Sequence, residues 1–143
     1  MRVVVDTNIL LVSVSERSPY HLIFELFVEG RYTLCVTTEI LDEYAEILTV
    51  QANSTVSNAT LETIENAQNV SFTTRYFAFD LIKVDPDDNK FVDCAIASNA
   101  DFIVTNDSHF GVLKAIPFPQ VKVISINTFM DLLEKLSSAS STE

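Results

Sequence analysis

Short apolar runs are separated along the chain by longer amphipathic or polar stretches. Short runs rich in β-branched and aromatic residues, bounded by polar residues, are typical of buried strands. We therefore predict strands at residues 3–5, 34–36, 102–104 and 121–124. Residues 69–84 mix β-branched and aromatic residues without a clean period, so we assign no element there.

The segments between these strands carry apolar residues at helical spacing. Leu41 and Leu48, for example, lie two helical turns apart with Tyr44 between them on one face. A threonine before the apolar series, Thr37 or Thr38, suits the N-cap position of that helix. We predict helices over residues 19–29, from 37 or 38 to about 48, 56–67, 88–100 and 127–136.

Strands that alternate with helices imply a parallel sheet whose two faces are both covered. We therefore predict an α/β fold, a three-layer α/β/α sandwich with a mostly parallel central sheet. With 143 residues and 48% hydrophobic content the chain fits one domain, which we place at residues 1–136. The last residues, 137–143, are serine-rich and predict a disordered polar tail.

Features of membrane and secreted proteins are missing from the sequence. It contains no apolar stretch approaching ~18 residues, and its N-terminus lacks a charged region followed by a long apolar segment. We therefore expect a soluble, cytoplasmic protein with no membrane contact. Cys35 and Cys94 lie in apolar stretches, where reduced core thiols are expected.

The chain is strongly acidic, with 20 Asp and Glu against 9 Lys and Arg and a formal net charge of −11. This charge is the opposite of the basic footprint expected of a nonspecific nucleic-acid binder. A nucleic-acid substrate would therefore need local basic groups or a bound metal ion to offset the repulsion. Solvated surface positions are the default for the candidate basic groups, which are Arg17, Arg31, Arg75, Lys83, Lys90 and Lys114.

Two aspartates lie just after the ends of predicted strands. Asp6 comes after residues 3–5, and Asp107 comes three residues after 102–104. Ligands of open α/β sheets bind outside the carboxyl ends of the strands, although acids there are also common in simple turns. Parallel strands that lie side by side would bring these two carboxylates near each other. Because like charges repel, the pair implies a bound cation or a raised pKa.

Further candidate acids lie on two predicted helices. Glu43 lies at the border of the buried face of the helix that ends near residue 48, from where it could reach over the end of the sheet. Asp87 and Asp88 open the helix that runs to about residue 100, where capping is the ordinary role of an aspartate. Asp93 lies in the apolar middle of that helix, and a buried carboxylate needs a partner or a metal. The choice between Asp88 and Asp93 stays open.

Together the candidate acids form a set of hard oxygen ligands, namely Asp6, Glu43, Asp88, Asp107 and, as a further candidate, Asp93. Such a set favours Mg²⁺ or Mn²⁺ over zinc. These ions commonly act on phosphodiesters by supplying a bound hydroxide and stabilising the attacking and leaving oxygens. Phosphodiester hydrolysis is the leading hypothesis for the chemistry.

The order and spacing of these residues resemble the PIN-domain family over residues 1–136. The resemblance rests on Asp6-Thr7-Asn8 after a strand, Glu43 on an early helix, Asp88 opening a helix with small residues, and Thr105-Asn106-Asp107 after a later strand. It implies a single-domain ribonuclease toxin of a toxin–antitoxin system that cuts single-stranded RNA with one or two Mg²⁺ or Mn²⁺ ions. It assigns the four catalytic and metal-binding acids to Asp6, Glu43, Asp88 and Asp107, with Asn8 and Thr105 orienting the first and last.

The same resemblance implies partners. We expect a small antitoxin whose basic or apolar segment occupies the acidic cleft, and the charge of −11 suits such a segment. We also expect a homodimer, for which the sequence offers only apolar residues such as Tyr20, Phe24 and Phe27. Asn106 departs from many family members, which carry Arg or Gly there, and this removes a contact to phosphate.

Two other functions compete with this hypothesis. A phosphatase using Asp6 as a nucleophile would usually carry a second aspartate two residues on, where this chain has Asn8. A catalytically inactive PIN fold could bind RNA or protein without cutting, although acids are present at all four positions. We interpret His109, two residues after Asp107, as a residue that packs in a loop.

Overall fold

A computed structural model describes residues 1–74, 81–82, 86–116 and 120–141 of the chain. In chain order the elements are β1 (Arg2–Val5), α1 (Thr7–Ser13), α2 (Leu22–Val28), β2 (Thr33–Val36), α3 (Thr38–Gln51), α4 (Ser54–Asn66), β3 (Val70–Phe72), the 3₁₀ helix η1 (Pro86–Asp88), α5 (Asn89–Ala97), β4 (Phe102–Val104), the 3₁₀ helix η2 (Ser108–Ala115), β5 (Val123–Ile124) and α6 (Ile126–Ser141). No helix of the described residues is both long and apolar enough to cross a lipid bilayer.

The strands form one parallel sheet in the order β3-β2-β1-β4-β5. From β1 the chain builds the sheet outwards through β2 and β3, and it then returns to the other side of β1 for β4 and β5. The strand order therefore reverses between β1 and β4, which is where open α/β sheets form a binding crevice at their carboxyl edge. The predicted α/β fold with a parallel sheet is confirmed.

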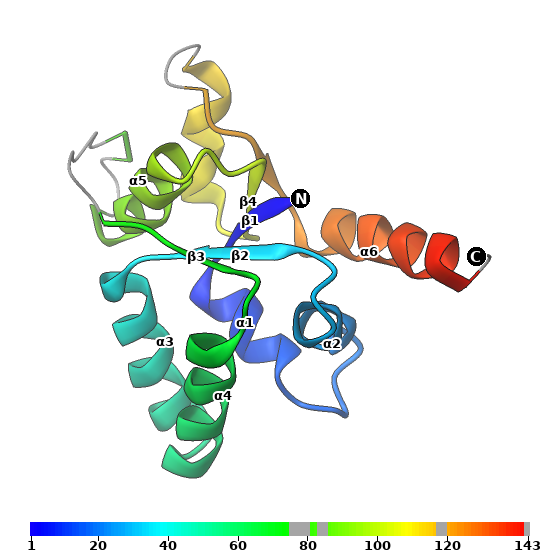
Figure 1. The fold of residues 1–143 in the computed structure, drawn as a ribbon. Helices are drawn as coiled ribbons and strands as arrows, with labels where there is room; N and C mark the ends of the chain where they lie inside the picture. The colour runs from blue at the N-terminus through cyan, green and yellow to red at the C-terminus, as the bar shows by residue number, and fades with distance from the viewer. Residues whose placement is uncertain (75–80, 83–85, 117–119, 142–143) are drawn as a thin grey trace.

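Helices cover both faces of this sheet (Figure 1). The helices α1 to α4 lie on one side, and α5 and η2 lie on the other. Helix α6 follows β5 and contacts α2. This arrangement is the predicted three-layer sandwich.

The central strands are unbroken apolar runs in the sequence because they are buried in the core. Residues Val3 to Val5 and Ile103 to Val104 are at most 1% exposed, as expected for strands covered on both faces. Tyr44 of α3 is fully buried beneath the carboxyl edge of the sheet, and its hydroxyl donates a hydrogen bond to the carbonyl of Val5. Burial raises the pKa of this hydroxyl well above its ordinary value, so Tyr44 stays protonated and anchors α3 to the end of β1.

The structure differs from the sequence prediction in several elements. Helix α1 was not predicted, because its seven residues are too few to show a helical period and begin with polar residues that resemble a turn. Strand β3 lies in the segment left unassigned, and the rest of that segment falls mostly outside the described residues. Helix α2 begins at Leu22 rather than at residue 19, and β5 is limited to Val123–Ile124.

The C-terminal residues and the apolar candidates for a dimer surface also differ from the sequence prediction. Helix α6 continues to Ser141, so it includes residues that we expected in a polar tail. Phe27, one of the residues considered for a dimer surface, belongs to the core and is 2% exposed. Tyr20 and Phe24 are half-buried against that core. Cys35 and Cys94 are buried free thiols, as predicted.

Candidate active site

The carboxyl ends of β1 and β4 bring Asp6 and Asp107 to one edge of the sheet. Val5 lies opposite Val104 in the parallel ladder, and the amide of Asp6 donates to the carbonyl of Val104 over 3.0 Å. The segments that follow β1 and β4 therefore leave the sheet side by side. The prediction that neighbouring parallel strands would bring these aspartates together is correct.

Thr105 links the two aspartates through its hydroxyl group. Thr105 Oγ1 donates to Asp6 Oδ2 over 2.7 Å and accepts the backbone amide of Asp107 over 3.0 Å. Thr105 is itself buried, so this short chain of hydrogen bonds is shielded from water. The resemblance implied that Asn8 and Thr105 orient the first and last carboxylates. In the structure Thr105 bonds the carboxylate of Asp6 and the backbone amide of Asp107.

Asp6 is 8% exposed, and its side chain makes no capping hydrogen bond to α1. Burial raises the pKa of this carboxyl above its ordinary value of 3.8, the hydrogen bonds from Thr105 and the Thr7 amide lower it in part, and the charges of Glu43 and Asp107 raise it further. The carboxylate therefore does not cap α1. It is held among like charges at a cost in free energy that a cation would reduce.

Glu43 reaches the same edge from the second turn of α3. Its Oε2 accepts a hydrogen bond from the hydroxyl of Thr7, and its Oε1 lies 2.7 Å from the ammonium of Lys90. Neither contact was predicted, because both depend on elements that lie far apart in the sequence. Lys90 is one of the basic candidates for which a solvated surface position was the default, whereas its side chain is 12% exposed.

Asp88 lies at the junction of η1 and α5, and it forms a group with Asp107 and His109. One ligand atom from each of these residues lies within 4.8 Å of the others. His109 Nδ1 is 3.4 Å from both Asp88 Oδ2 and Asp107 Oδ1. His109 was interpreted as a packing residue, and the structure instead places it between two acids, so its spacing of two residues after Asp107 was the signal that could have found it.

Local contacts fix this end of the site. The side chain of Asp88 makes no capping hydrogen bond to α5, although Asp88 occupies the N-cap position. The start of α5 is held instead by Asn89, whose buried amide accepts from the backbone of Ile82 and donates to it over 2.8 and 2.7 Å. Asp107 does cap η2, since Oδ1 accepts the amide of His109 over 2.9 Å. Asp107 therefore retains the turn role as well as its place among the acids.

Asp93 does not belong to the group formed by Asp88, Asp107 and His109. It lies in the middle of α5 and is 1% exposed. Residues five apart in a helix point in directions that differ by about 140°. The geometry therefore favours Asp88 over Asp93 as the acid that faces the site.

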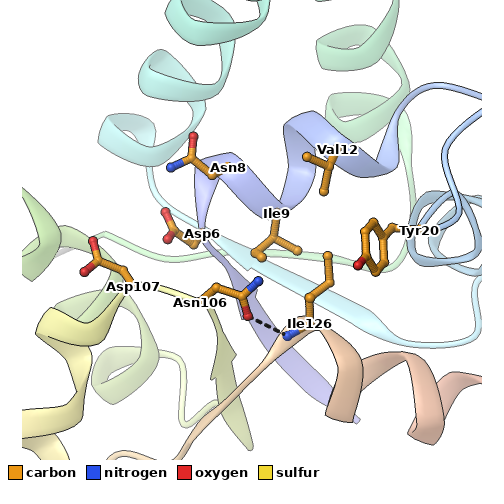
Figure 2. Close-up of a pocket in the computed structure, with 8 residues that line it drawn as sticks. All are labelled: Asp6, Asn8, Ile9, Val12, Tyr20, Asn106, Asp107 and Ile126. Carbon is orange, nitrogen blue, oxygen red and sulfur yellow. Dashed lines mark hydrogen bonds between the residues drawn. The ribbon is translucent and has the colours of Figure 1, made fainter.

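A pocket of about 380 Å³ opens beside the aspartates. Figure 2 shows Asp107 and Asp6 at one end of it and Tyr20 at the other, with Ile9 and Ile126 between them. Asn8 is exposed and lines the pocket, but it makes no hydrogen bond to Asp6 within the described part of the chain.

Asn106 also lines the pocket. Its Oδ1 accepts the first amide of α6, at Ile126, over 3.1 Å, which fixes the orientation of its side-chain amide. The loop that carries Asp107 is thereby tied to the start of α6.

The residues present suit a divalent metal ion. The close group of Asp88, Asp107 and His109 offers two carboxylates and an imidazole, and Mn²⁺ and Mg²⁺ prefer oxygen ligands, with imidazole also acceptable to transition metals. Asp6 is the neighbouring acid, whose pKa is raised chiefly by burial and further by the charges of Glu43 and Asp107. A cation held among these side chains would balance their negative charge.

Few of the basic candidates from the sequence lie near the acids. Among the described residues, Arg31 donates to the carbonyl of Leu136 over 2.7 Å, and Arg17 and Lys114 are exposed. Arg75 and Lys83 fall outside the described residues. Of the described basic candidates, Lys90 contacts one of the acids, Glu43.

A family model for the PIN domain matches residues 2–109. This range includes all four predicted acids, Asp6, Glu43, Asp88 and Asp107. The chain therefore belongs to the PIN-domain family, and the resemblance seen in the sequence is confirmed. No curated protein matches the sequence.

Solved structures with the same fold include two from toxin–antitoxin systems. A chain in the crystal structure of VapBC2 from Rickettsia felis, bound to a DNA fragment from the promoter, is similar with a TM-score of 0.61 and 18% identity over 87% of this chain and 98% of that chain. VapC20 from Mycobacterium tuberculosis, a toxin that cleaves the sarcin–ricin loop, has a TM-score of 0.57 and 14% identity over 84% and 98% of the two chains. At these identities the likeness concerns the fold.

The raised pKa of Asp6 predicts a pH-dependent effect on stability. The folded state holds the Asp6 proton more tightly than the unfolded state, so ionisation of this group lowers the free energy of unfolding as the pH rises from about 3.8 through the raised pKa. We expect metal-free Asp6→Asn to gain stability relative to the wild type across that range and to keep this gain at neutral pH. Urea unfolding of both proteins in chelator, at a series of pH values, measures the difference in stability between variant and wild type. If this difference favours the variant less at pH 7 than at pH 4, the prediction is wrong.

Proposed function

We propose that this PIN-domain protein is a metal-dependent ribonuclease that hydrolyses phosphodiester bonds of single-stranded RNA. The observation that carries the proposal is the convergence of Asp6, Glu43, Asp88 and Asp107 at the edge of the sheet where the strand order reverses. Membership of the PIN family supports the same chemistry. The neighbouring pocket of about 380 Å³ has an apolar wall that suits a base or ribose of the substrate.

The proposed roles follow from the positions of the side chains. Asp6, Asp88 and Asp107 would hold one or two Mg²⁺ or Mn²⁺ ions, which when bound supply an activated water and stabilise the charge on the phosphate oxygens. Thr105 keeps Asp6 and the Asp107 backbone in register through its hydroxyl. Glu43, paired with Lys90 and Thr7, orients the water or completes the metal site. The negative charge of the cluster requires the cation before an RNA phosphate can approach.

The direct test is cleavage of a generic single-stranded RNA with Mn²⁺ and with chelator. We expect cleavage by the wild type with Mn²⁺, and a loss of about 100-fold or more in Asp6→Asn and in Asp107→Asn, because each removes a charge from the metal site. Asp42→Asn serves as the matched control, since Asp42 is exposed on the same helix as Glu43. RNA binding without any cleavage by the wild type would instead support a catalytically inactive binding module, and equal rates in chelator would exclude metal dependence.

The assignment of the third acid has its own test. We expect Asp88→Asn to lose cleavage by about 100-fold while keeping the stability of the wild type, because Asp88 is half-buried and faces Asp107 and His109. Asp93→Asn should act mainly on stability, because Asp93 lies within the packed middle of α5. Thermal unfolding and initial cleavage rates are measured on both variants. A fully stable Asp93→Asn that cannot cut RNA, beside an active Asp88→Asn, would reverse the assignment.

We further propose that the protein is the toxin of a toxin–antitoxin pair, acting on RNA in the cytoplasm, with a small antitoxin as partner. The similar folds of the Rickettsia and Mycobacterium proteins support this, and the net charge of −11 suits a basic or apolar antitoxin segment lying over the acidic edge.

A homodimer is proposed on family analogy alone. We expect expression to arrest growth, and coexpression of the antitoxin to relieve it. Normal growth with abundant wild-type protein would contradict the toxin role, and a monomer in light scattering at micromolar concentration would contradict the dimer.

A further inference from the structure

Lys90 is held in an unusual place for a lysine. Its ammonium lies 2.7 Å from Glu43 Oε1 and donates to the carbonyl of Asp87 over 2.7 Å. It also lies 5.3 Å from the centre of the ring of Phe91, which is 1% exposed. Only 12% of the side chain is exposed. Lysine side chains are mostly exposed, and those that are buried have their charge paired.

The helix itself does not favour a cation at this position. Lys90 is the second residue of α5, and the N-terminal turn of a helix carries partial positive charge that repels cations. The attraction that holds Lys90 in place must therefore come from outside the helix. Glu43 on α3 supplies it directly, and α3 and α5 are in contact.

Glu43 in turn has both carboxylate oxygens engaged by groups of the protein. Thr7 donates to Oε2 and Lys90 to Oε1. Thr7, which donates to Glu43, directly follows Asp6 in the chain, so the carboxylate of Glu43 lies near that of Asp6. The ammonium of Lys90 therefore reduces the negative charge of this group of acids. A divalent ion that used Glu43 would bind a carboxylate that already pairs with Lys90, and it would stand close to a like charge.

We infer that Lys90 is a built-in counter-ion of the acidic site, which stabilises the metal-free fold through Glu43 and competes with the divalent ion for the charge of the cluster. The competition rests on the proposed metal site, whereas the stabilisation through Glu43 does not. Lys90 is on this account a positioning residue, because it acts through Glu43. The ammonium of Lys90 and the divalent ion are two cations at one site, so each lowers the affinity of the site for the other, and this coupling is reciprocal.

The experiment compares Lys90→Gln and Lys90→Arg with the wild type in two measurements that do not involve RNA. Isothermal titration of the chelator-treated protein with Mn²⁺ gives the affinity, and thermal unfolding without metal gives the stability. We expect Lys90→Gln to bind Mn²⁺ about tenfold more tightly and to unfold at a lower temperature without metal. Lys90→Arg keeps the charge and should remain close to the wild type in both. Lys114→Gln is the control for net charge, since Lys114 is exposed on η2.

The role of Glu43 is separated by a double-mutant cycle. If Lys90 stabilises the protein through Glu43, Lys90→Gln should lower the unfolding temperature in the wild type but hardly change it when Glu43→Gln is also present. Equal losses in both backgrounds, or an unchanged or weaker Mn²⁺ affinity in Lys90→Gln, overturn the inference. A wild type that binds no Mn²⁺ at millimolar concentration overturns the proposed metal site and the competition together, while the cycle still decides whether Lys90 is the counter-ion of Glu43.

Discussion

The hydrogen bond from the Asp6 amide to the Val104 carbonyl is the contact on which the arrangement of the site depends. It closes the pairing of β1 with β4 at the point where the strand order reverses, so that the chain leaves both strands at one place. Thr105 then uses a single hydroxyl to fix the Asp6 carboxylate and the Asp107 backbone. Without this junction the acids would remain on separate elements with no common edge.

Repulsion between the carboxylates opposes the arrangement that the strand order imposes on them. Burying Asp6 among Glu43 and Asp107 raises its pKa, which means that the ionised site is less stable than the same groups would be in water. Hydrogen bonds from Thr7 and Thr105 and the ammonium of Lys90 partly offset this loss of stability. The site is therefore partly balanced by the protein and partly open to a cation from solution.

The sequence predicted the parts of this site that depend on local pattern. Asp6 and Asp107 could be found because each follows a short apolar strand, and a parallel sheet aligns such exits. The contacts of Lys90 and Thr7 with Glu43 could not be found, because they join elements separated by dozens of residues and leave no periodic trace. Helix α1 was missed for a related reason: seven residues with buried Ile9 and Leu10 do not distinguish a helix from a loop that packs on the core.

The hydrogen bond between Thr105 and Asp6 joins residues 99 positions apart, and this separation bears on when the site can form during synthesis. A contact of such range requires closure of a long loop, so it forms late compared with local helices. A nascent chain that has emerged through α4 already contains Asp6 and Glu43, but it lacks β4, Thr105 and Asp107. Truncated and unfinished chains therefore cannot assemble the acidic edge, and the complete set of acids appears only after β4 has joined β1.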